Sequence, residues 1–92
     1  MYKITSYSFK KAKKLNLKIY PSSNSKYKID VFDSDDNYIT SIGASGYSDY
    51  STYVITHGLK YANERRKLYK HRHSKDRHVY FSRGWLADNI LW

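Results

Sequence analysis

The stretch YKIDVFDSDDNYITSIG, residues 27–43, decides the fold. Every second residue of Tyr27–Phe32, beginning with Tyr27, is apolar, and this alternation is typical of a half-buried strand. The run DSDDN at 33–37 is rich in turn-forming residues, and Tyr38–Ile42 reads as a second strand. The stretch therefore predicts an antiparallel hairpin.

The residues before the hairpin predict a further strand and a short helix. Leu17–Tyr20 alternates apolar and polar residues until Pro21, which favours a strand that ends there. Lys3–Tyr7 is interpreted as an initial strand, and Ser8 as the N-cap of a short helix. That helix has three residues on its apolar side: Phe9, Ala12 and Leu15.

The second half of the chain contains residues that typically begin and end helices. Ser48 or Asp49 is placed to cap a short helix that ends at Gly58, and a long basic helix is expected from Leu59. Ser82 is placed to cap a last amphipathic helix. The predicted fold class is therefore α+β, in which a small antiparallel sheet, a hairpin or a three-stranded meander, is packed by a long basic helix and a short C-terminal helix.

Length and composition indicate one small domain over residues 1–92. Its expected parts are a lysine-rich N-terminal part at 1–26, the hairpin at 27–46 and a helical part at 47–92. The chain has no Cys, which excludes disulfides and zinc fingers. It also lacks an apolar run of a signal peptide or of the roughly 20 residues that span a bilayer, so we expect a soluble protein with no membrane partner.

Charge is segregated along the chain. Residues 1–28 carry eight Lys and no acid, residues 29–56 carry five Asp and no Lys or Arg, and residues 57–80 return to a net charge of +6. This layout suits an anionic ligand, and it equally suits pairing of acidic and basic segments within the fold or between subunits.

Aromatic residues are expected to form much of the core. Tyr and Trp bring large buried areas to a domain of this size. An alternative for the tyrosines is a platform on which bases stack, and for the two Trp a docking patch. The residues assigned to the core are Tyr47, Tyr50, Tyr53, Tyr61, Tyr69, Trp85 and Trp92.

The long basic helix is expected to have two sides. Its buried stripe is predicted to contain Tyr61, Ala62, Leu68 and Tyr69. Arg65 and Arg72 border this stripe. Two roles are open for each guanidinium: an ion pair with a carboxylate of the fold, or bidentate binding of a ligand phosphate. The preferred interpretation is structural, and the predicted members of ion pairs are Arg65, Arg72, Asp49 and Asp76.

The outer side of the helix is the candidate ligand surface. Side chains that point away from the buried stripe are available to phosphates. The predicted nucleic-acid contacts are Lys60, Arg66, Lys67, Lys70, His71, Lys75 and Arg77. A second patch is predicted at Lys10, Lys11, Lys13 and Lys14.

No catalytic constellation is expected. His71 and His73 are two residues apart on a helix and point in different directions, and no Cys or patterned carboxylate completes a metal site. Glu64 and Asp76 are single acids among bases, so a metal-dependent nuclease is the least favoured alternative. We therefore predict a protein that is not an enzyme and has no catalytic residues, no metal and no cofactor.

Several short segments of the chain are distinctive: Ser41-Ile42-Gly43, Tyr47 with Asp49-Tyr50 and Tyr53, Arg65-Arg66 with Tyr69, Arg72-His73, Asp76-Arg77 and the ending Leu91-Trp92. In these segments the chain resembles a family of short uncharacterised basic proteins encoded by large DNA viruses of algae and protists and by their virophages. The resemblance covers roughly residues 27–92, and the hairpin turn has Asp36-Asn37 where related chains have Gly.

The resemblance implies a viral setting, in the virion or inside the infected host cell, and no mechanism. In that setting the expected function is sequence-tolerant binding of nucleic acid or another polyanion, associated with genome packaging. The alternative is a minor virion component that contacts capsid proteins or other copies of itself.

Overall fold

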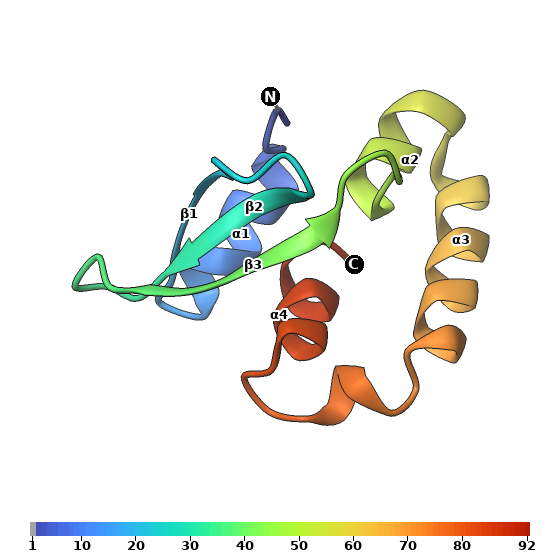
Figure 1. The fold of residues 1–92 in the computed structure, drawn as a ribbon. Coiled ribbons are helices and arrows are strands. Elements are labelled where there is room, and N and C mark those ends of the chain that lie inside the picture. The colour runs from blue at the N-terminus through green and yellow to red at the C-terminus, as the bar shows by residue number, and fades with distance from the viewer. Residues whose placement is uncertain (1) are drawn as a thin grey trace. The chain divides into compact units, whose positions relative to one another are not determined.

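The computed structural model describes residues 2–92 and contains a three-stranded antiparallel sheet with strand order β1-β2-β3 (Figure 1). The strands are β1 Lys18–Pro21, β2 Tyr27–Phe32 and β3 Tyr38–Ala44. The predicted hairpin is the pair β2 and β3, and β1 extends it into a meander. The helices that accompany the sheet make the fold α+β, as predicted.

The chain divides into two units, residues 1–47 and 48–92, which are described separately. In the first unit the buried apolar side chains of the sheet share one face, because Ile29 pairs with Ile42 and Val31 pairs with Ile19 across the strands. Asp30, between them, points to the other face. An irregularity in the pairing at Val31/Phe32 places Phe32 opposite Tyr38.

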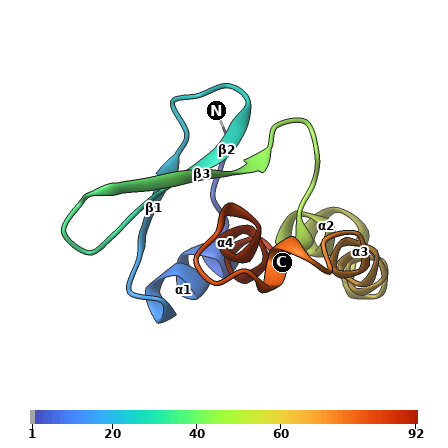
Figure 2. The same cartoon turned by 60° about the horizontal axis from the view of Figure 1, so that its bottom comes forward.

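The first helix differs from the prediction at its beginning. Helix α1, Ser6–Lys14, lies on one side of the sheet (Figure 2). Its N-cap is Thr5, whose hydroxyl accepts a hydrogen bond from the amide of Ser8 at 3.4 Å. The predicted strand Lys3–Tyr7 and the predicted cap at Ser8 are therefore wrong, because Thr5 supplies the same capping chemistry three residues earlier.

The second unit is helical: α2 is Tyr50–His57, α3 is Leu59–Arg72, η1 is Asp76–His78 and α4 is Arg83–Ile90. Asp49 caps α2 by accepting the amide of Thr52 at 3.1 Å, and Ser82 caps α4 by accepting the amide of Trp85 at 3.2 Å. Gly58 separates α2 from α3 with a φ of +91°, which glycine adopts at little cost. Both caps and this break agree with the sequence.

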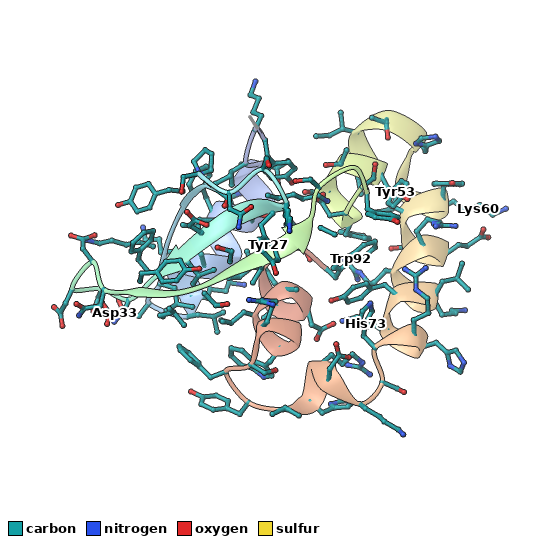
Figure 3. All side chains as sticks on the ribbon, viewed as in Figure 1. Tyr27, Asp33, Tyr53, Lys60, His73 and Trp92 are labelled. Atoms are coloured by element: carbon teal, nitrogen blue, oxygen red, sulfur yellow. The ribbon has the colours of Figure 1, made fainter. Side chains whose placement is uncertain are left out.

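Rings pack together where α2, α3 and the C-terminus meet. Trp92 lies against Tyr69 with ring centroids 4.4 Å apart and 7° between the planes, and Tyr53 approaches Trp92 at 6.2 Å. The labelled side chains of Tyr53 and Trp92 lie next to each other in Figure 3. Tyr50, Tyr69 and Trp92 are buried, whereas Tyr53 and Trp85 are half-buried.

Three apolar residues were assigned to the wrong environment. Tyr47 is 75% exposed, because it follows the turn at Gly46 and precedes the first residue of α2. Leu68 is 52% exposed, because it points about 100° away from its buried neighbour Tyr69 on the helix. Tyr61 lies at the border of the buried stripe and is exposed rather than part of the core.

Candidate nucleic-acid interface

The exposed side of α3 carries a line of basic side chains. At about 100° per residue, Lys60, Lys67 and His71 fall within about 40° of one another around the helix axis. All three are exposed, and Glu64 is the one acid on the same line. Lys60 and His73 point from opposite sides of α3 in Figure 3, so the helix separates a solvent face from a packed face.

Apart from the exposed Glu64, the acids of the second unit have roles inside the unit. Asp49 is buried and caps α2. Asp76 accepts a hydrogen bond from the His73 ring at 3.0 Å, and this bond lowers the pKa of the Asp76 carboxyl below its ordinary value. Asp88 on α4 pairs with Lys70. These contacts leave few carboxylates for the basic residues on the outer face of α3.

Lys70 and Arg77 have an internal partner, in contrast to their predicted role as free phosphate contacts. The Lys70 ammonium lies 2.7 Å from Oδ1 of Asp88, and Nη1 of Arg77 lies 3.8 Å from Oδ2 of the same carboxylate. The Nε–H of Arg77 also donates to the carbonyl of Lys70 at 3.2 Å. All three side chains are half-buried, so Asp88 joins α3, η1 and α4.

Arg66 is also packed rather than outward-facing. Its guanidinium lies 3.5 Å from the centroid of the Tyr50 ring, and its buried Nε has no hydrogen-bond partner among residues 2–92. The hydroxyl of Tyr50 donates to Asn63 at 2.9 Å, which fixes the ring beneath the guanidinium. The prediction that Arg66 faces a ligand is wrong, because α2 packs against this side of α3.

The ion pairs predicted for Arg65 and Arg72 do not form among residues 2–92. Arg65 is half-buried with its guanidinium 5.6 Å from the centroid of the Tyr53 ring, so an aromatic face takes the place of a carboxylate. Arg72 is exposed and joins the outward cations of α3. Asp76 forms an ion pair with His73, and Asp49 is the buried N-cap of α2.

Within residues 59–75, which cover α3 and the turn after it, four exposed cations have no carboxylate at ion-pair distance: Lys60, Lys67, Arg72 and Lys75. We call these four residues together with His71 the basic face. Each belongs to α3 or to the turn that follows it, so one short segment of chain displays them all. The basic face is therefore the part of the predicted site that the fold leaves available.

The second predicted patch lies on α1 in the other unit. Lys10, Lys13 and Lys14 are exposed there. Lys11 is half-buried, and its ammonium lies 5.6 Å from the centroid of the Tyr7 ring. This patch of three exposed lysines is smaller than the basic face, which has four cations and His71.

A column of planar side chains along α3, beginning at the end of α2, was not predicted from the sequence. His57, Tyr61, Arg65, Tyr69 and His73 recur every fourth residue, a spacing that places successive side chains next to each other on a helix. His57 stacks on Tyr61 with centroids 4.5 Å apart, and the Tyr69 and His73 rings are 4.4 Å apart. The recurrence of these planar side chains at every fourth position is the sequence signal that could have predicted the column.

The sequence interpretation also missed a row of rings across the sheet. Phe32 makes edge-to-face contacts with Tyr20 at 5.4 Å and with Tyr38 at 5.7 Å. Asp30, next to this row, accepts hydrogen bonds of 2.6 Å from the hydroxyls of Ser22 and Ser41. Desolvation opposes ionisation of Asp30, but these bonds outweigh it and its pKa is lowered, so this face carries a fixed negative charge.

A membrane span requires a long and apolar helix, and a metal site requires ligand side chains that are grouped in space. Among residues 2–92, no helix is both long and apolar enough to cross a bilayer, and no group of three His, Asp or Glu side chains is placed to hold a metal ion. Comparison of the chain with protein-family models, with curated proteins and with solved structures finds no match, so the resemblance to the viral family stays a prediction.

Proposed function

We propose that the protein binds nucleic acid without sequence preference through the basic face. The observation that carries the proposal is that the exposed cations of this face lack carboxylate partners, whereas Lys70 and Arg77 have one in Asp88. A cation that already has a buried partner gains little from a phosphate, whereas an unpaired one releases counterions from the nucleic acid.

The geometry of the basic face supports contact with the nucleic-acid backbone rather than with base edges. Lys60 and Lys67 are seven residues apart, which is about 10.5 Å along a helix axis. Single lysines at this spacing neutralise phosphates but offer no paired donors and acceptors for a base edge. Arginine is the residue best suited to read guanine, and the packed position of Arg66 leaves Arg72 as the arginine of the basic face.

A viral setting gives the proposal a biological role. A basic protein that tolerates any sequence neutralises phosphates during genome packaging. The resemblance to proteins of large DNA viruses supports this role, and with it we propose that the protein acts in the virion or inside the infected cell.

The test is a salt titration of binding to a labelled duplex, followed by fluorescence anisotropy. Lys60→Ala/Lys67→Ala should lower the affinity and reduce the slope of log K against log salt by about 2. The matched control is Lys3→Ala/Lys26→Ala, which removes the same charge from two exposed positions of the other unit. An equal loss in both variants would show that net charge, and not the basic face, determines binding.

A second candidate function is assembly with capsid proteins or with other copies of the chain. The observation that favours it is the exposed acidic turn between β2 and β3, which contains Asp35 and Asp36 and is complementary in charge to the basic face. One of these acids is already paired, since Asp36 lies 3.1 Å from the Lys18 ammonium. Size-exclusion chromatography with light scattering separates the two candidates: an oligomer that persists in high salt and ignores DNA favours assembly.

A further inference from the structure

A loop of the second unit exposes three apolar side chains in succession. Val79, Tyr80 and Phe81 connect η1 to α4, and Tyr80 is 76% exposed. Two of the three are aromatic, so the loop presents ring faces where a soluble domain usually presents polar groups. We call these three residues the aromatic loop.

The rings of the aromatic loop rest on a tryptophan of α4. Tyr80 contacts Trp85 edge to face at 4.9 Å, and Phe81 lies 5.9 Å from Trp85 and 5.5 Å from Tyr80. Trp85 is half-buried and belongs to a helix that Ser82 caps. The rings of Tyr80 and Phe81 therefore pack on Trp85, while the Tyr80 side chain remains largely exposed.

The backbone holds the loop in a strained conformation. Phe81 has a φ of +64°, a region that bulky residues rarely adopt. The amide of Ser82 donates to the carbonyl of Val79 at 3.1 Å, and its hydroxyl donates to the carbonyl of Asp76 at 3.2 Å. Gly84 packs so closely on Asp76 that a Cβ would lie 2.9 Å from the carboxylate. Strain retained in this way is characteristic of functional segments.

The charge around the loop identifies what it fits. Residues 77–87 contain Arg77, His78 and Arg83. The two acids that flank this segment already have partners, because Asp76 pairs with His73 and Asp88 pairs with Lys70 and Arg77. A row of rings on the sheet, Tyr20, Phe32 and Tyr38, lies instead beside the ionised Asp30 and so repels a polyanion. Rings beside cations, next to acids that already have partners, suit a ligand that has both flat faces and phosphates.

We infer that the aromatic loop binds unpaired bases, so that the preferred ligand is single-stranded nucleic acid. This inference rests on the proposed function and adds the class of nucleic acid to it. In a duplex the base faces are already stacked on one another, whereas in a single strand each base can stack on a tyrosine or phenylalanine ring. The basic face then contacts the phosphates of the same ligand class.

The test compares an oligothymidylate of about 16 nucleotides with a duplex of the same length at one salt concentration. Tyr80→Ala should weaken binding of the single strand about tenfold and leave the duplex affinity within about twofold. Tyr80→Phe should keep the single-strand affinity, because the ring remains. Tyr38→Ala is the matched control, since it removes a ring that is 58% exposed beside Asp30 and should change neither affinity.

An optical measurement gives an independent readout from the same loop. The chain has two Trp, so in a Trp92→Phe background the emission comes from Trp85 alone. Bases that stack on the adjacent Tyr80 and Phe81 should quench this emission, and the duplex should quench it less. Circular dichroism of each variant checks that it is folded.

The outcomes distinguish the inference from the proposed function. If Tyr80→Ala leaves single-strand binding unchanged while Lys60→Ala/Lys67→Ala weakens it, the inference is overturned and the proposed function stands. If neither probe binds to the wild type, both are overturned. If Tyr80→Ala instead abolishes binding to vesicles of phosphatidylserine and phosphatidylcholine and spares the oligothymidylate, the loop is a membrane contact and the inference is again overturned.

Discussion

The Tyr69 ring lies parallel to the Trp92 ring, at 4.4 Å between centroids and 7° between planes. One ring belongs to α3 and the other is the last residue of the chain. Burial raises the pKa of the Tyr69 hydroxyl above its ordinary value, which agrees with a ring enclosed by its neighbours. This stack joins the C-terminus to the helix that carries the basic face.

Loss of the Trp92 ring should destabilise the protein. Trp92→Ala removes a buried aromatic side chain, and we expect a loss of about 3–5 kcal/mol in the free energy of unfolding. Urea denaturation followed by circular dichroism measures the change. Trp92→Phe keeps a ring against Tyr69 and should lose much less, so an unchanged midpoint for Trp92→Ala would show that the ring serves a docking surface instead.

Two neighbouring residues of α3 should respond in opposite ways. Leu68→Ala changes an exposed side chain and should alter the free energy of unfolding by less than about 0.5 kcal/mol. Tyr69→Ala removes a buried ring and should cost about 3–5 kcal/mol. Thermal unfolding of the two variants, side by side, tests which face of α3 is buried. Equal losses would contradict the orientation of the helix.

Removal of the Asp88 charge should lower stability and raise nucleic-acid affinity. Asp88→Asn leaves Lys70 and Arg77 without their carboxylate, and loss of charged hydrogen bonds of this kind costs about 1.5–3 kcal/mol. The two cations then become available to phosphates, so binding should tighten and its salt slope should steepen. The control is Asp35→Asn, which removes an equal charge from an exposed turn and should be nearly neutral in stability.

The stability of the sheet should depend on the ionisation of Asp30. Its pKa in the folded protein lies below the ordinary value of 3.8, so the folded state binds fewer protons than the unfolded state in this range. The stabilisation is therefore complete above pH 3.8 and is lost as the pH falls through the lower folded value. Thermal unfolding against pH measures this loss, which should be absent in Asp30→Asn. A folded pKa above 3.8, measured by NMR titration, would contradict the expectation.

Local signals in the sequence located the elements that depend on neighbouring residues alone. The alternation in Tyr27–Phe32 marked β2, and Asp49, Gly58 and Ser82 marked the helix ends, because capping is decided within one turn of the chain. The beginning of α1 was misplaced since Thr5 and Ser8 have equivalent side-chain chemistry, and no local rule separates them.

The candidate site was less predictable because it depends on tertiary packing. Arg65 and Arg66 are adjacent and chemically identical, yet each lies over a different tyrosine of α2. Lys70 differs from the other lysines of α3 because it pairs with Asp88, which is 18 residues away in the sequence. Neither the ring of Tyr50 nor the carboxylate of Asp88 could be assigned to these cations from spacing alone.

The irregular pairing of β2 with β3 affects whether neighbouring copies of the protein aggregate through their sheets. A three-stranded sheet has two open edges, and such edges tend to join to other sheets and to form aggregates. Here one edge is the short strand β1, which begins with Lys18 and ends with Pro21, a residue that has no amide to donate. The other edge strand is β3, whose pairing with β2 is irregular near Tyr38, and an irregularity of this kind bends and twists the strand that carries it. Copies bound side by side along one polymer should therefore stay separate at high local concentration, without the edge-to-edge polymerisation that leads to fibres.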